Sequence, residues 1–299
     1  MPLIYYRELK GEVDVIIDEY TTAPFMTPLY VKEEKKVLLV HLLAGERIRY
    51  EIPSSIKWLS PFFQRMESKI LRVYKDTCII AVSESTAKEL KAIGLRNVHI
   101  VEPGIDIEKY KYSNKDEEPL LLYFGRIVPY KGVEDTIMTF NLVLKKVSNI
   151  RGVIAGKCVN SEYANYIKGL IKKFGLEKKL QVKFNISEEE KVALLEKAWI
   201  LILPSLKEGF NIVCLEALAS GTPVIGYNVP GIRDVIINER IGTLVSRGDI
   251  KGLSRAILNL LEKEEMLEEM RRVCREYATK FTWRRSAEKF RNILLSTNE

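Results

Sequence analysis

Glu208 and Glu216 lie eight residues apart in the segment PSLKEGFNIVCLEALASGTPVI, residues 204–225. An apolar run precedes the segment, and a glycine and a proline follow its helical part, which predicts a strand, a loop and a helix. Backbone N–H groups of the loop would point outward with the positive end of the helix dipole behind them, toward an anion such as a diphosphate. Both carboxylates would flank that ligand. The predicted contacts are Glu208, Gly209, Phe210, Asn211, Ile212 and Glu216.

A second segment, LLLYFGRIVPYKGVEDTI (residues 120–137), predicts a strand that ends at Gly125 and is followed by Arg126 and Lys131. These cations lie five residues apart in the loop and helix start, so they can converge. Cations fixed in a water-poor cleft stabilise the charge that develops on a departing diphosphate. The alternative is a solvated arginine and lysine after the strand, and this segment alone does not decide between the two.

Short β-branched apolar runs alternate with helical stretches along the whole chain. Most runs are apolar at successive positions, as expected when both faces of a sheet are covered. The predicted fold class is therefore α/β, doubly wound. The nine predicted strands cover residues 13–18, 36–41, 78–83, 98–101, 120–125, 153–157, 180–184, 199–204 and 222–227.

The length of 299 residues favours two domains. The polar stretch 106–119 cannot form a core, so the first domain is expected to cover residues 1–112 and the second 113–280. In residues 281–299, Phe281, Trp283, Ala287, Phe290 and Leu294 follow near-helical spacing. They predict a terminal helix that crosses back onto the first domain.

Composition excludes several classes of protein. No apolar run reaches the roughly 18 residues that a transmembrane helix requires, and the charged N-terminus lacks signal-peptide character, so a cytoplasmic protein is expected. The four cysteines stand singly, which suggests neither zinc nor disulfides. The net charge of +7 permits an anionic partner. No nucleic-acid-binding motif accompanies the charge, and the G-x-G-x-x-G motif of dehydrogenases is absent.

The Glu-x7-Glu segment closely resembles the signature of the family 4 retaining glycosyltransferases, the glycosyl transferase group 1, and GRxxxxKG resembles the same family's diphosphate-binding pair. The resemblance implies a GT-B fold of two Rossmann-like domains and a metal-independent transfer, consistent with the absence of a D-x-D pair. It assigns Glu208 to the donor sugar, Glu216 to the ribose, and Arg126 and Lys131 to the diphosphate.

The resemblance also implies further contacts and substrates. The donor would be a GDP-, UDP- or ADP-linked sugar, the acceptor a saccharide or a lipid-linked molecule, and no other cofactor is implied. His41 ends a predicted strand, where a lone histidine is more often structural, but the surrounding sequence looks like the family's acceptor domain. His41 would then face the acceptor. The further predicted contacts with the nucleotide are Gly125, Gly156, Lys157, Phe184 and Asn185.

Relatives begin with about three further βα units, so the first domain is expected to lack its first strands and to expose the run 13–18 as a sheet edge. Such an edge invites a second copy or a partner chain. An alternative to the enzyme is therefore a catalytically silent subunit or fragment that binds nucleotide sugar and needs a partner.

The stretch 56–75 predicts an amphipathic helix with Leu59, Phe63, Met66, Ile70 and Val73 on one face and basic residues on the other. Contact with an anionic membrane surface is one interpretation. A crossover helix buried against the first sheet, with a solvated basic face, is favoured.

Overall fold

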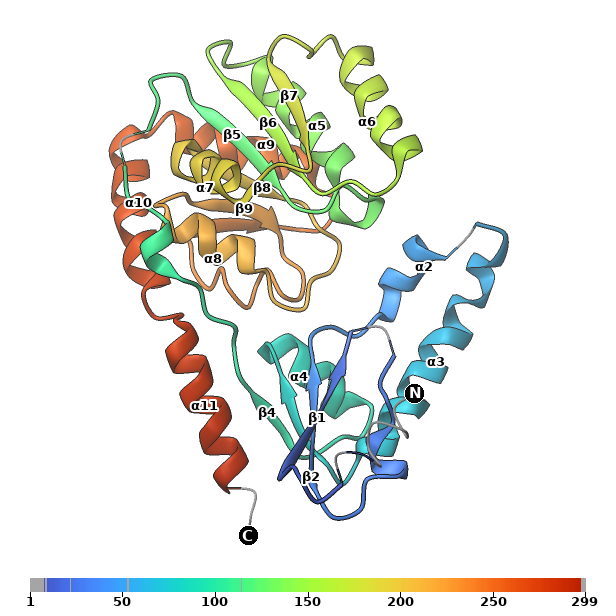
Figure 1. Cartoon of the computed structure of the whole chain (residues 1–299). Coiled ribbons are helices and arrows are strands. Elements are labelled where there is room, and N and C mark those ends of the chain that lie inside the picture. The colour runs from blue at the N-terminus through green and yellow to red at the C-terminus, as the bar shows by residue number, and fades with distance from the viewer. Residues whose placement is uncertain (1–7, 9, 22, 53, 114, 297–299) are drawn as a thin grey trace. The chain divides into compact units, whose positions relative to one another are not determined.

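The computed structural model describes residues 8, 10–21, 23–52, 54–113 and 115–296 (Figure 1). The chain divides into two compact units, residues 1–103 with 284–299 and residues 104–283. The boundary precedes the one expected near residue 112, because Ile105 and Tyr110 are buried in the core of the second unit. Among the described residues, no helix combines the length and apolar character needed to cross a membrane.

The first unit contains a four-stranded parallel sheet in the order β1-β2-β3-β4. Its strands are β1 (Val15–Tyr20), β2 (Lys35–Val40), β3 (Cys78–Ala81) and β4 (Val98–Ile100). Its helices are η1 (Thr27–Leu29), η2 (Gly45–Arg47), α2 (Ile48–Glu51), η3 (Ser54–Leu59), α3 (Ser60–Leu71), η4 (Arg72–Tyr74), α4 (Glu84–Ala92) and most of α11 (Trp283–Ser296).

Both faces of this sheet are covered. Leu38 and Ile79 belong to a buried cluster with α3 and α4 residues, whereas their strand neighbours Val37 and Ile80 face a second cluster. Phe290, Ile293 and Leu294 of α11 pack against that second cluster at i, i+3, i+4 spacing. Two residues differ from the predicted docking face, because Trp283 and Ala287 are exposed.

The second unit contains a six-stranded parallel sheet in the order β10-β9-β8-β5-β6-β7. Its strands are β5 (Leu120–Phe124), β6 (Arg151–Gly156), β7 (Leu180–Phe184), β8 (Ile200–Leu203), β9 (Val224–Tyr227) and β10 (Gly242–Val245). Its helices are η5 (Ile107–Lys109), η6 (Pro129–Lys131), α5 (Val133–Leu144), α6 (Ser161–Lys173), α7 (Glu188–Lys197), α8 (Ile212–Ala219), α9 (Ile250–Leu261) and α10 (Glu264–Ala278). The chain reversal between β8 and β5 is the kind of switch point where open sheets bind ligands.

The predicted α/β class and all nine predicted strands are confirmed. The sequence prediction missed β10, which is only four residues long. Among the described residues, β1 is a terminal strand of its sheet, as predicted for the run 13–18.

Helix α3 differs from its prediction. Met66 was expected in the buried face but is 41% exposed. Buried residues of α3 are instead Ser60 and Leu71, while Phe62 is exposed.

Candidate functional site

The loops that follow β5 and β8 are locked together at the carboxyl edge of the second sheet. Gly132 has φ +70°, and a Cβ there would lie 2.1 Å from the carbonyl oxygen of Pro204, so a larger residue would separate the loops. Leu206 N–H also donates to the Tyr130 carbonyl oxygen at 2.9 Å. The two sequence segments that carry the predicted chemistry therefore form one structure.

Within this structure, Lys131 and Glu208 form an ion pair. The Lys131 Nζ lies 2.6 Å from both carboxylate oxygens, and the side chains are only 13% and 10% exposed. Low exposure to solvent strengthens the attraction between the two charges, and this attraction offsets the cost of removing each charge from water. Lys131 follows β5 and Glu208 follows β8, so their direct contact brings the predicted diphosphate and sugar contacts together.

Arg126 lies beside this pair. Its guanidinium donates to the Tyr130 hydroxyl, and its Cζ is 5.5 Å from the centre of the Tyr130 ring, while Lys131 Nζ is 5.6 Å from the same centre. Arg126 is exposed, whereas Tyr130 is buried. Both predicted cations thus lie beside the same buried ring, and Arg126 is the one that is exposed to solvent.

The start of α8 forms as predicted, with one difference. Asn211 caps the helix, because its side chain accepts from Cys214 N–H at 3.0 Å. The prediction that the Asn211 amide is unpaired is wrong, since this N–H donates to the Gly231 carbonyl oxygen at 3.2 Å. The N–H groups of Phe210 and Ile212 have no hydrogen-bond partner among the described residues.

The residues around this cap differ in burial. Gly209 is buried and Ile212 is exposed. The Phe210 ring lies 6.3 Å from the Phe281 ring, so it packs into the fold.

The loop after β9 supports Glu208 directly. A Cβ at Gly231, where φ is +80°, would lie 2.5 Å from Glu208 Cβ, and Glu208 N–H donates to the Pro230 carbonyl oxygen at 3.2 Å. Gly231 N–H in turn donates to Asp234 at 2.8 Å. The resemblance to the family 4 glycosyltransferases also covers this loop, residues 230–234, where Pro230 replaces the first of the two glycines that many relatives carry.

Glu216 is held by a different set of partners. One carboxylate oxygen lies 2.7 Å from both the Tyr110 hydroxyl and Lys191 Nζ, and all three residues are buried. Burial would lower the pKa of Lys191, but hydrogen bonds to Glu188 and Glu216 outweigh it and raise that pKa. Burial, and then the Glu216 charge, raise the pKa of Tyr110, which stays a donor.

No described hydrogen bond or ion pair joins the Glu216 cluster to Arg126, Lys131 or Glu208. Tyr110 and Lys191 were not selected from the sequence, because a single tyrosine and a lysine among glutamates carry no distinctive pattern.

The predicted contacts at the ends of β5, β6 and β7 come together. A Cβ at Gly156, where φ is +145°, would lie 1.8 Å from the Gly125 carbonyl oxygen. Asn185 N–H donates to the Gly156 carbonyl oxygen at 2.9 Å, and the Lys157 carbonyl oxygen accepts from Ile127 N–H at 2.8 Å. Asn185 itself has φ +53°, a conformation that asparagine tolerates better than most residues.

Phe184 ends β7 beside this group. The Lys168 Nζ lies 5.2 Å from the centre of the Phe184 ring, so a lysine of α6 covers one face of it.

His41 belongs to the first unit, where it follows β2. Its Nε2 lies 2.7 Å from Glu19 Oε1, and the two side chains are 42% and 55% exposed. The structure thus pairs His41 with a carboxylate that the sequence analysis did not select. Its role toward an acceptor stays a prediction.

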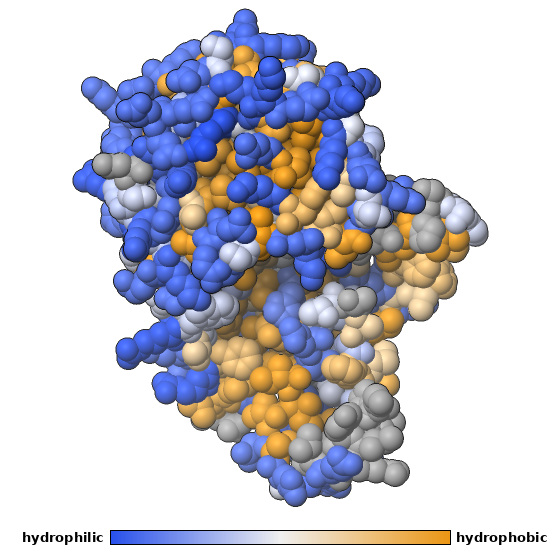
Figure 2. Space-filling model, turned by 45° about the horizontal axis from the view of Figure 1, so that its top comes forward, coloured by the Kyte–Doolittle hydropathy of each residue, from blue (hydrophilic) through white to orange (hydrophobic). Residues whose placement is uncertain are grey.

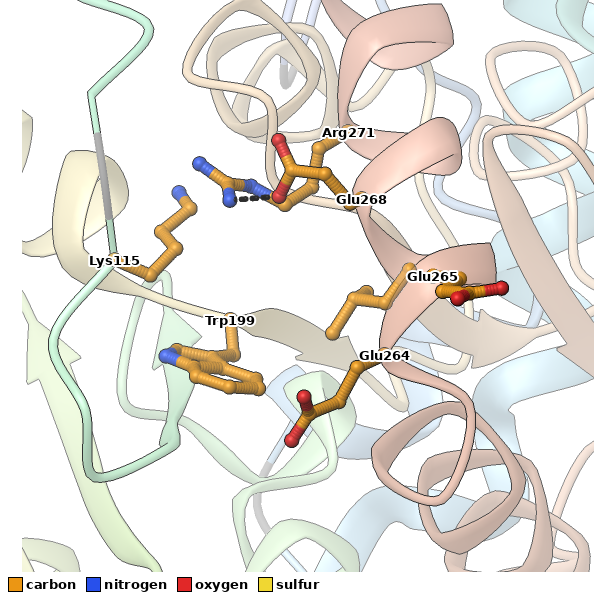
Figure 3. A pocket seen from close by; sticks show the side chains of 7 residues that line it. Lys115, Trp199, Glu264, Glu265, Glu268 and Arg271 are labelled. Carbon is orange, nitrogen blue, oxygen red and sulfur yellow. Dashed lines mark hydrogen bonds and ion pairs between the residues drawn. The ribbon is translucent and has the colours of Figure 1, made fainter.

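A cavity of about 330 Å³ lies at the opposite edge of the second sheet (Figure 3). Trp199, at the start of β8, and the first turns of α10 line it together with Lys115. The charged groups at its inner end are already bonded, since Lys115 donates to Glu196 O, Ser220 O and Thr222 Oγ1. Because the predicted site residues follow the carboxyl ends of the strands, this cavity is separate from them.

Residues 105–281 match the family described as glycosyl transferases group 1. This match covers more than half of the chain, so the protein belongs to that family. Its fold is GT-B, as the sequence resemblance implied.

Curated relatives agree with this assignment. The chain is 26% identical to glycogen synthase of Mycobacterium tuberculosis, over 74% of this chain and 53% of the relative. It is 27% identical to the capsular polysaccharide biosynthesis glycosyltransferase CapM of Staphylococcus aureus, over 93% of this chain and 74% of the relative. The GDP-mannose:cellobiosyl-diphosphopolyprenol alpha-mannosyltransferase of Xanthomonas campestris is 26% identical, over 69% of this chain and 55% of the relative.

The chain spans about half the length of the first and third of these relatives. Among solved structures, HepE of Anabaena in complex with UDP superposes with a TM-score of 0.82 at 17% identity, over 98% of this chain and 82% of that one.

Proposed function

We propose that this protein transfers a sugar from a nucleotide diphosphate donor to an acceptor hydroxyl, with retention of anomeric configuration and without a metal ion. The proposal rests on one observation above the others. The loops after β5 and β8 interlock so that Arg126, Lys131 and Glu208 meet at the carboxyl edge of a parallel sheet, beside the start of α8.

The chemistry of these groups fits such a transfer. The bond between the anomeric carbon and the diphosphate oxygen breaks, and the diphosphate gains negative charge. Arg126 and the N-terminal end of α8 face that charge, and the N–H groups of Phe210 and Ile212 add two donors. The acceptor oxygen attacks from the leaving-group side, and its proton passes to the departing phosphate oxygen.

Glu208 and Lys131 have a joint role in this proposal. The carboxylate accepts hydrogen bonds from donor sugar hydroxyls, while Lys131, 2.6 Å from it, compensates its charge and faces the diphosphate. Glu216 accepts from the ribose, and the Gly125, Gly156, Lys157, Phe184 and Asn185 group lies where the nucleotide base would bind. His41 acts on the acceptor side, as the sequence resemblance suggests.

The names of relatives suggest the substrates. UDP is bound in the HepE structure, GDP-mannose is the named donor of the Xanthomonas relative, and a diphosphopolyprenol its named acceptor. We infer a GDP-, UDP- or ADP-linked sugar as donor and a saccharide or lipid-linked acceptor.

A thermal-shift screen of GDP-, UDP- and ADP-sugars tests donor binding first, because a bound donor raises the melting temperature. Transfer and donor hydrolysis are then measured with the stabilising donor. Glu208→Gln keeps the shape of the side chain but removes its charge, and we expect at least a roughly hundredfold loss of turnover with the fold intact. Glu177→Gln, an exposed carboxylate, is the matched control. Full activity of Glu208→Gln would refute the assignment.

The alternative is a subunit that binds nucleotide sugar but is catalytically silent until a partner chain completes it. The terminal position of β1 in its sheet favours this candidate. Stabilisation by a donor without transfer or hydrolysis supports the silent subunit, whereas turnover by the purified chain removes it.

A further inference from the structure

The outward face of η3 and α3 carries large apolar side chains in a single line. Trp58, Phe62 and Met66 lie at i, i+4 and i+8 and are 75%, 57% and 41% exposed. A helix that only crosses over a sheet would present polar residues to water on this face. In Figure 2, orange and tan atoms gather on the projecting α2–α3 segment at the right.

The basic and acidic side chains of the same stretch lie on different faces of the helix. Lys57, Arg65 and Lys69 are exposed beside the apolar line. Residues 54–75 contain one acidic residue, Glu67, and it is turned inward. Its carboxylate accepts from the Tyr20 hydroxyl and Ala44 N–H, both at 2.6 Å. The charged side chains on the outward face are therefore all cations, and they lie beside the apolar line.

The inward contacts fix which face points outward. Glu67 also accepts from Gly45 N–H at 3.1 Å, and Gln64 donates to the Gly45 carbonyl oxygen at 3.0 Å. With Leu71 buried in the core, these contacts prevent α3 from rotating to hide the apolar line.

We propose that this face, the outward side of Lys57–Lys69, docks the protein on an anionic phospholipid membrane. Trp58 sits at the level of the headgroups, Phe62 and Met66 enter the outer acyl region, and the cations pair with lipid phosphates. The charge argues for this occupant, because a second copy would bring three further cations against the same face. The proposal deepens the proposed function, since a lipid-linked acceptor would be reached from such a surface.

Vesicle co-sedimentation without any donor tests the proposal independently of transfer. We expect the wild-type protein to bind vesicles of phosphatidylcholine with phosphatidylglycerol and to bind pure phosphatidylcholine at least roughly tenfold more weakly. Trp58→Ser/Phe62→Ser and Lys57→Glu/Arg65→Glu/Lys69→Glu should each lower binding to the anionic vesicles by at least roughly tenfold.

Matched controls change other exposed residues in the same manner. Val159→Ser/Tyr166→Ser removes two exposed apolar side chains, and Lys172→Glu/Lys173→Glu/Lys178→Glu reverses three exposed charges. Both should bind like the wild type. Equal binding to both vesicle types, or equal loss in the charge control, would overturn the proposal.

Light scattering without vesicles tests the competing occupant of this face, a second copy of the chain. A wild-type dimer that Trp58→Ser/Phe62→Ser converts to a monomer would identify the face as a contact between copies and overturn the membrane assignment. Loss of vesicle binding with unchanged transfer to a soluble acceptor leaves the proposed function intact, so the two proposals fail separately.

Discussion

At the residue scale, Lys131 and Glu208 stabilise the fold as an ion pair, and in the proposed function the same side chains bind the donor. Removing either partner leaves the other largely buried without its counter-charge, which costs about 3 kcal/mol in comparable pairs, whereas removing both costs less. We therefore expect the losses of unfolding free energy in Lys131→Met and Glu208→Gln, added together, to exceed the loss in the double variant. A double-mutant cycle by urea unfolding measures this coupling.

Activity should behave differently in the same cycle. The double variant recovers stability but lacks both groups that are proposed to contact the donor, so its turnover should stay at the level of the worse single variant. Additive stability losses would show that the pair is not coupled, and recovered turnover would remove both residues from the mechanism.

Lys191 is the counter-charge of Glu216, the residue proposed to bind the ribose. Lys191→Met removes the cation 2.7 Å from the carboxylate and leaves Glu216 buried without that partner. We expect nucleoside diphosphate affinity to fall about tenfold. Titration calorimetry measures the effect.

Lys197→Met, at the exposed end of the same helix, is the control for Lys191→Met. Equal nucleoside diphosphate affinity in wild type and Lys191→Met would restrict Lys191 to a structural role. Tyr110→Phe should weaken binding less, since it removes a hydrogen bond without removing charge.

At the scale of elements, Lys115 joins three parts of the second unit. Its amine connects the segment before β5 to the carbonyl oxygens of Glu196 and Ser220, at the ends of α7 and α8. Burial, and then the charge of Arg271, lower its pKa from 10.5 to about 7. Because the folded protein binds fewer protons than the unfolded chain between these values, this group makes stability rise with pH above 7.

We expect the unfolding free energy to rise by about 1 kcal/mol between pH 7 and 8.5 through Lys115, and this rise to be missing in Lys115→Met. Urea midpoints at several pH values test this. Lys178→Met, which is exposed, should keep the wild-type slope. The pH range of this test ends near 8.5, because burial raises the pKa of the Cys274 thiol, and this group lowers the stability as the pH rises further. An identical slope in wild type and Lys115→Met would contradict the prediction.

The same elements explain what the sequence could predict. Runs such as LLLYF are apolar at every position because both faces of the sheet are covered, so β5 and its neighbours were identifiable. Helix α3 has apolar residues on two sides, Phe62 and Leu71 among them, and periodicity does not tell which side meets the core. The Lys131–Glu208 contact joins residues 77 positions apart and depends on how two loops interlock, which no local pattern encodes.

At the scale of the whole molecule, β1 ends its sheet among the described residues, and a terminal strand is a template for pairing with a second copy. Ile17 of this strand is 48% exposed, and Glu19, its exposed carboxylate, is paired with His41. Ile17→Lys places a charge there, so we expect it to weaken self-association at least roughly tenfold relative to the wild type. Light scattering after size exclusion, over a range of concentrations, measures this. Ile237→Lys, an exposed isoleucine outside the strands, should associate like the wild type. A wild-type protein that is monomeric at every concentration would show that this edge pairs with no second copy.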